Sequence, residues 1–143
     1  MEQIKIHWIH GKAGTGKTYL VNKLIQEKIN NGEVEKSEIS MLGSFNRGYW
    51  LSSVKPYTKI LIDDFVMPKK KGELNEYLKV LRGEPIYIKM EGYVHTNLTD
   101  IYIQSLYTPE EVLKEYVNEF NIIRYELTHV YPTGVEINFV NQF

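Results

Sequence analysis

The chain contains one stretch that decides its fold, Gly11-Lys12-Ala13-Gly14-Thr15-Gly16-Lys17-Thr18, which fits the pattern G-x-x-x-x-G-K-[ST]. Glycines let the backbone curl, so that several N–H groups converge on one phosphate. A helix that begins at Lys17 adds its own free N–H groups and its positive dipole end. We therefore expect these eight residues, called the phosphate loop below, to bind a nucleotide. Lys17 would reach the β- and γ-phosphates, and the Thr18 hydroxyl would ligate Mg²⁺.

Strand and helix patterns alternate on both sides of this loop. Apolar strands are predicted near 4–9, 39–42, 59–62 and 101–103, and helical stripes near 17–29, 74–81 and from Pro109 onward. The last stretch alternates on both sides of a turn at 132–134, which is typical of a hairpin. The pattern predicts an α/β fold with a mostly parallel central sheet, flanking helices and a C-terminal β-hairpin. No linker or repeat divides the chain, so we expect one domain over residues 1–143.

The composition excludes several other classes of protein. Hydrophobic residues make up 43% of the 143 residues and charged residues 24%, which is an ordinary globular balance. A formal net charge of -1 excludes a uniformly basic nucleic-acid coat, and the lack of Cys excludes disulfides and thiolate zinc sites. No apolar run approaches the roughly 20 residues of a membrane helix, and no secretory signal begins the chain. We expect an intracellular protein without a membrane partner.

Two adjacent acids follow a short apolar run. Ile60-Leu61-Ile62 is typical of a buried parallel strand, and Asp63 and Asp64 come directly after it. Because parallel strands end at the edge where the phosphates are expected, Asp63 would hold Mg²⁺, directly or through water. Asp64 would polarise the attacking water. Together with the phosphate loop, the pair predicts ATP or GTP hydrolysis with Mg²⁺.

These motifs together resemble a known family. Trp8 to Thr18, Ile62-Asp63-Asp64-Phe65, and Ile101 to Ser105 with Pro109-Glu110-Glu111 are similar to the superfamily 3 helicase domain. The form they most resemble is in the Rep replication initiators of circular single-stranded DNA viruses and rolling-circle plasmids, over about Lys5 to Tyr116. The resemblance implies an AAA+-like P-loop NTPase that uses ATP to move along single-stranded DNA as a hexamer. It also implies a location in the host nucleus for a eukaryotic virus, or in the cytoplasm for a bacterial plasmid.

The resemblance also nominates residues outside the phosphate loop. The family's sensor Asn corresponds to Leu106 here, and Gln104 is the candidate to contact the γ-phosphate or the attacking water instead. Arg124 follows the third motif, where the family has an arginine finger that acts on a neighbouring subunit. The family's DNA-gripping hairpin corresponds to residues 86–96, and its candidate contacts are Lys89, Tyr93 and His95.

Two alternatives to a DNA helicase motor stay open. One is a viral RNA-replication NTPase of the same superfamily. The other is a nucleotide-dependent assembly module without unwinding, which the loss of the sensor Asn at Leu106 keeps open. The family places a nuclease domain and an oligomerisation segment before the ATPase, and neither is visible in this sequence. We therefore expect this chain alone to be a monomer or a weak oligomer.

Overall fold

The computed structural model describes residues 3–42, 54–68, 71–88, 92–128 and 139–142. Its helices are α1 (Lys17–Asn30), α2 (Lys71–Arg82) and α3 (Pro109–Leu113), with 3-10 turns η1 (Lys36–Glu38) and η3 (Lys114–Glu119). Its strands are β1 (Lys5–Gly11), β2 (Ile39–Leu42), β3 (Ile60–Asp64), β4 (Ile86–Ile88), β5 (Gly92–Val94), β6 (Asp100–Ser105), β7 (Asn121–Leu127) and β8 (Phe139–Gln142).

The central sheet has the order β2-β3-β6-β1-β7-β8. The first five strands in that order pair in parallel, and β8 pairs antiparallel with β7. This arrangement confirms the predicted α/β class and the antiparallel C-terminal pair. The predicted turn at 132–134 lies outside the described residues. β4 and β5 form a separate two-stranded sheet.

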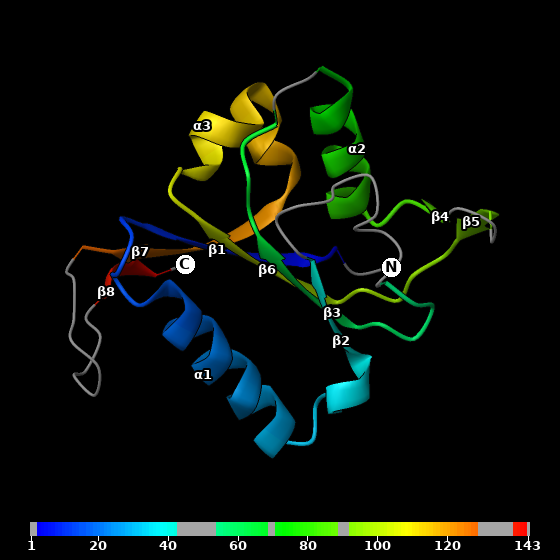
Figure 1. The fold of residues 1–143 in the computed structure, drawn as a ribbon, viewed down its shortest axis with the longest axis horizontal. Helices are drawn as coiled ribbons and strands as arrows, with labels where there is room; N and C mark the ends of the chain where they lie inside the picture. The colour runs from blue at the N-terminus through cyan, green and yellow to red at the C-terminus, as the bar shows by residue number, and fades with distance from the viewer. Residues whose placement is uncertain (1–2, 43–53, 69–70, 89–91, 129–138, 143) are drawn as a thin grey trace.

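Helices cover both faces of the sheet (Figure 1). α1 lies on one face, and α2 and α3 lie on the other. Alternate strand residues point to opposite faces, and two buried clusters result. Ile60 and Ile62 pack with the α1 residues Leu20 and Val21, whereas Leu61 packs with residues of α2 and α3. Consecutive residues of one strand therefore pack into different halves of the core.

The parallel strands end at one edge of the sheet, which we call the carboxyl edge. β1 enters the phosphate loop there, β3 ends at Asp64, and β6 ends at Ser105. Because β6 lies between β1 and β3, its last residues are placed between the loop and the acids. Among the described residues, no helix is long and apolar enough to cross a membrane.

Two local predictions are also confirmed. α3 starts at Pro109, and Thr108 caps it reciprocally with Glu111, which is a capping box. The hairpin expected over residues 86–96 contains β4 and β5, and Gly92 has a φ of 80° that favours glycine.

Candidate functional site

The phosphate loop has the backbone that the glycines predict. Gly14 and Gly16 have φ values of 80° and 93°, in the left-handed region that favours glycine. Gly11 is needed for a different reason: a Cβ there would lie 2.6 Å from the Leu127 carbonyl oxygen and 2.8 Å from Thr15 Oγ1. Gly16 caps α1 without a side-chain hydrogen bond. The start of α1 thus carries no side-chain cap where a phosphate is expected to bind.

Lys17 contacts the loop from which it extends. Its Nζ donates to the carbonyl oxygens of Gly11, at 2.7 Å, and Lys12, at 2.9 Å. The Thr15 hydroxyl also donates to the Lys12 carbonyl, at 2.7 Å, and Thr15 is buried. Partial burial lowers the pKa of Lys17, and the carboxylate of Asp64 opposes that shift. The ammonium group is therefore held over the loop and within the electrostatic reach of Asp64.

Thr18 is joined to β6. Its hydroxyl donates to Gln104 Oε1 at 2.8 Å, across 86 positions of sequence. Gln104 is buried, with 8% of its surface exposed, and it pairs in register with Ile9 on one side and Asp64 on the other. The structure therefore brings three predicted site residues, Thr18, Asp64 and Gln104, to one place at the carboxyl edge.

The two adjacent acids have different surroundings. Asp63 is buried, and its Oδ2 accepts a hydrogen bond of 2.7 Å from the hydroxyl of Tyr77, a residue of α2. Asp64 is exposed, and its charge acts on Lys17. Neighbouring strand residues point to opposite faces, so the structure places Asp63 toward α2 and Asp64 toward the phosphate loop. The sequence alone favoured Asp63 as the metal ligand, whereas Asp64 is the acid on the side of the phosphate loop.

Arg124 lies on β7, beside Trp8 of β1, and forms a two-pronged ion pair with Glu110 at the start of α3. Arg124 Nη1 donates to Glu110 Oε1 at 2.6 Å, and Nη2 contacts Oε2. The hydrogen bonds to Glu110 raise the pKa of Arg124, and they lower the pKa of Glu110. The candidate finger thus contacts an acid of its own chain.

The β4–β5 hairpin extends away from the main sheet (Figure 1). Tyr87 and Tyr93 lie opposite each other in its register, with ring centroids 5.4 Å apart in an edge-to-face arrangement. They are 56% and 75% exposed. His95 is exposed just after β5, and Lys89 lies outside the described residues. Two of the three predicted nucleic-acid contacts therefore lie on or beside an exposed aromatic hairpin.

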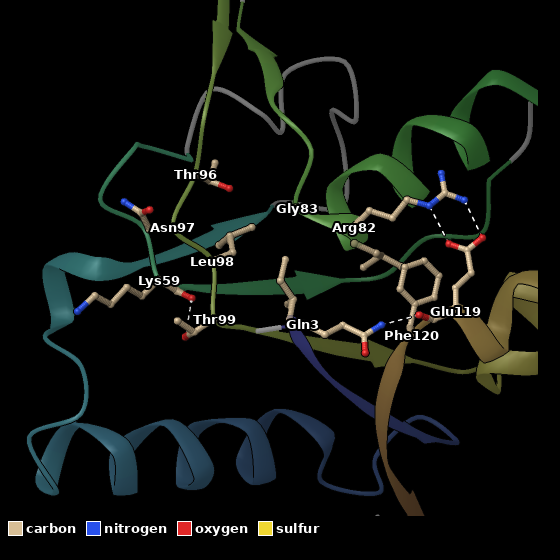
Figure 2. Close-up of a pocket in the computed structure, with 12 residues that line it drawn as sticks. Gln3, Lys59, Arg82, Gly83, Thr96, Asn97, Leu98, Thr99, Glu119 and Phe120 are labelled. Atoms are coloured by element: carbon tan, nitrogen blue, oxygen red, sulfur yellow. Dashed lines mark hydrogen bonds and ion pairs between the residues drawn. The ribbon is translucent and has the colours of Figure 1, made fainter. Parts of the chain in front are cut away.

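A cavity of about 630 Å³ lies at the opposite edge of the sheet, where the strands begin (Figure 2). Its walls include the end of α2, the segment before β6 and the residues just before β7. The cations on its wall are paired: Arg82 Nε donates to Glu119 at 2.8 Å, and Lys59 lies 3.1 Å from Glu38. The phosphate loop lies at the other edge, so this cavity is separate from the candidate site.

The oxygen ligands at the carboxyl edge fit Mg²⁺. Mg²⁺ in nucleotide sites is held by one or two protein oxygens together with phosphates and water. The Thr18 hydroxyl and the Asp64 carboxylate supply oxygens of that kind on the face of Lys17. Mg²⁺ would be held there by Thr18 and Asp64.

Two contacts of the candidate site residues, one made by Asp63 and one by Arg124, were not predicted from the sequence. Tyr77 belongs to an ordinary apolar helical stripe, and Glu110 to an acidic first turn, so neither pattern reveals its partner. Only the packing of α2 and α3 on the sheet brings Tyr77 to Asp63 and Glu110 to Arg124.

One comparison with known proteins covers the candidate site. The family model described as RNA helicase matches residues 7–105, which is more than half of the chain. The match spans the phosphate loop, both acids and Gln104, and it ends before Glu110 and Arg124. A search of the curated proteins finds no match.

Proposed function

The chain belongs to the RNA helicase family, and on that premise we propose that it hydrolyses ATP with Mg²⁺ to move along single-stranded nucleic acid. One observation carries the proposal. The Thr18–Gln104 hydrogen bond joins the start of α1 to β6, directly beside Asp64 in the strand register. A phosphate-binding loop, a hydroxyl ligand, a carboxylate and a polar amide thus share one edge of a parallel sheet.

Each of these groups has a role that its position supports. The loop N–H groups and the start of α1 bind phosphate oxygens. Lys17 exchanges the carbonyls of Gly11 and Lys12 for phosphate oxygens, since both are hydrogen-bond acceptors for the same ammonium. Bound Mg²⁺ supplies charge neutralisation for the phosphates. Asp64 is exposed, and its charge acts on Lys17 of the phosphate loop. It is therefore placed to act on the metal or on the attacking water.

The substrate we propose first is the single-stranded DNA of a rolling-circle replicon, in a Rep initiator. The motif details at Asp63-Asp64-Phe65 and Pro109-Glu110-Glu111 support it. RNA is the second candidate, and the description of the matching family favours it. For either substrate, we propose that Tyr93, His95 and Lys89 contact the strand. Exposed aromatic rings stack on bases without sequence preference.

We further propose that the active form is a homo-oligomeric ring, a hexamer in the full-length protein, in which Arg124 serves the site of a neighbouring subunit. In this structure Arg124 is bound to Glu110 of its own chain. Its use by a neighbour requires that this pair opens. A chain that is a monomer or a weak oligomer on its own would therefore hydrolyse ATP slowly, and turnover would rise with protein concentration. Arg124→Ala should remove that rise and leave nucleotide affinity nearly unchanged.

The proposal is tested by ATPase assays with no polymer, with single-stranded DNA and with single-stranded RNA. Lys17→Ala is the control, because the loop loses its one ammonium aimed at the phosphates. Stimulation by one polymer supports a motor and identifies its substrate. Nucleotide binding without turnover under all three conditions supports the assembly module instead. Wild-type turnover in Lys17→Ala would contradict the site.

A further inference from the structure

The hydrogen bond between Thr18 and Gln104 has a direction. The atom of Gln104 that lies 2.8 Å from Thr18 Oγ1 is the carbonyl oxygen Oε1, which accepts only, so Thr18 is the donor. A hydroxyl has one hydrogen and two lone pairs. Once the hydrogen is directed at Gln104, both lone pairs point elsewhere.

The surroundings hold Gln104 in this position. Its side chain is 8% exposed, and its backbone oxygen accepts from the N–H of Phe65 at 2.9 Å. Strand pairing fixes it between Ile9, two residues before the loop, and Asp64. Because Gln104 is buried and its strand is paired on both sides, its amide oxygen has a fixed position. The hydrogen bond to that oxygen restricts the rotation of the Thr18 hydroxyl.

Asp63 is engaged on the other side of the sheet. Asp63 accepts from Tyr77 of α2, and it was the acid that the sequence assigned to the metal. Gln104 is neutral, so it accepts the Thr18 hydrogen without adding a second carboxylate beside Asp64. The oxygen of Thr18 remains available as a ligand.

We propose that Gln104 is a positioning residue for the metal: by accepting the Thr18 hydrogen, it turns the lone pairs of Thr18 toward Mg²⁺. This inference rests on the proposed function, because it assumes a nucleotide with Mg²⁺ at the phosphate loop. It assigns Gln104 a role through Thr18, distinct from the direct γ-phosphate contact expected from the sequence. Partners that orient a metal ligand typically change metal affinity about 10- to 100-fold when removed.

The test measures Mg²⁺ affinity without turnover. Binding of a fluorescent ADP analogue to the whole chain is followed during a Mg²⁺ titration and, separately, in EDTA. Gln104→Met keeps the side-chain length but offers only a weak acceptor, so the Mg²⁺ midpoint should rise by about tenfold or more. Affinity in EDTA should not change. Gln104→Glu keeps an acceptor and should return the midpoint to the wild-type value or below.

Thr18 supplies the matched controls. Thr18→Val removes the hydroxyl and should raise the Mg²⁺ midpoint by itself, whereas Thr18→Ser should not. Because Gln104 acts only through that hydroxyl, adding Gln104→Met to Thr18→Val should cause no further rise. Thr18 is exposed, so its variants should fold, and they show whether the hydroxyl is the metal ligand on which the inference depends. Gln104→Glu tests Gln104 itself if the buried Gln104→Met fails to fold, because a raised Mg²⁺ midpoint in a variant that keeps the acceptor would overturn the inference.

The outcomes separate the inference from the function on which it rests. A wild-type chain that does not bind the ADP analogue would overturn the proposed function. Mg²⁺-dependent binding by the wild type, with the same midpoint in Gln104→Met, would overturn the inference alone. Additive effects of Thr18→Val and Gln104→Met would overturn it as well, because they would show that Gln104 acts independently of Thr18.

Discussion

The hydroxyl of Tyr77 donates to the carboxylate of Asp63 at 2.7 Å, with Tyr77 1% exposed and Asp63 5% exposed. This contact joins α2 to β3 one residue before Asp64. It gives Asp63 a structural partner on the face opposite the phosphate loop. The two acids that look equivalent in the sequence therefore differ in surroundings, and their substitutions should differ in effect.

Tyr77→Phe should destabilise the fold. The change removes one hydrogen bond to a buried carboxylate, and such losses cost about 1–3 kcal/mol. The free energy of unfolding in urea measures it. Tyr93→Phe is the control, because Tyr93 is 75% exposed and its change should stay within about 0.5 kcal/mol. Equal stability of Tyr77→Phe and the wild type would show that the contact contributes nothing.

Asp64→Asn should reduce ATP turnover on the order of 100-fold or more, because the group that acts on the metal or the water loses its charge. Its stability should change little, since the side chain is exposed. Asp63→Asn should have the opposite effects: it should lower the urea midpoint, and it should reduce turnover less than Asp64→Asn does. Urea unfolding and single-turnover assays on both variants decide it. Greater loss of turnover in Asp63→Asn than in Asp64→Asn would contradict this expectation and would favour Asp63 as the acid of the site.

The sequence predicted most of the fold because its signals are local. The phosphate loop, the apolar strand before Asp63 and the proline start of α3 each depend on neighbouring residues. Alternation along β3 also decides to which face of the sheet each acid points. That inference requires knowing that the strand continues through both acids, and the apolar pattern ends before Asp63. The partners of Asp63, Thr18 and Arg124 come from 14 to 86 positions away. No local pattern encodes such partners, since they depend on how β6, α2 and α3 pack.

Gly11→Ala should damage the loop. The added Cβ would meet the Leu127 carbonyl oxygen at 2.6 Å, and a backbone atom in β7 cannot move aside cheaply. Overpacking of this kind costs about 1–3 kcal/mol. Gly72→Ala is the control, since nothing lies within 4 Å of its Cβ and alanine favours a helix. Calorimetry should show a lower melting temperature for Gly11→Ala only. A lower one for both variants would contradict the steric account.

Asp100 should make the fold sensitive to acid. His7 Nε2 donates to Asp100 at 2.7 Å, Thr99 donates at 2.8 Å, and Lys28 lies 3.7 Å away. Burial alone would raise the pKa of Asp100, but these hydrogen bonds and charges outweigh it, so the pKa lies below its usual value.

A lowered pKa in the folded state means that Asp100 stabilises the fold above the unfolded pKa, about 3.9, and that this contribution is lost as the pH falls further. Asp100→Asn should be less stable than the wild type at pH 7, and the difference should shrink below about pH 4. Urea unfolding at several pH values measures it. A difference that stays constant down to pH 2 would show that the ionised carboxylate is not the source of the stabilisation.

Tyr93→Ala should weaken binding of single-stranded nucleic acid. Tyr93 is the more exposed of two hairpin tyrosines in edge-to-face contact, and a stacked base contributes about 1–3 kcal/mol per aromatic side chain. The expected loss is about 5- to 150-fold in affinity for labelled oligonucleotides. Because tyrosine carries no charge, the dependence of binding on salt should keep its slope. Tyr57→Ala is the matched control, since Tyr57 is 58% exposed but lies in the segment before β3, outside the β4–β5 hairpin. Parallel titrations with DNA and RNA of one sequence would also identify the preferred polymer. An equal loss in both variants would mean that general surface contacts, not the hairpin, hold the strand.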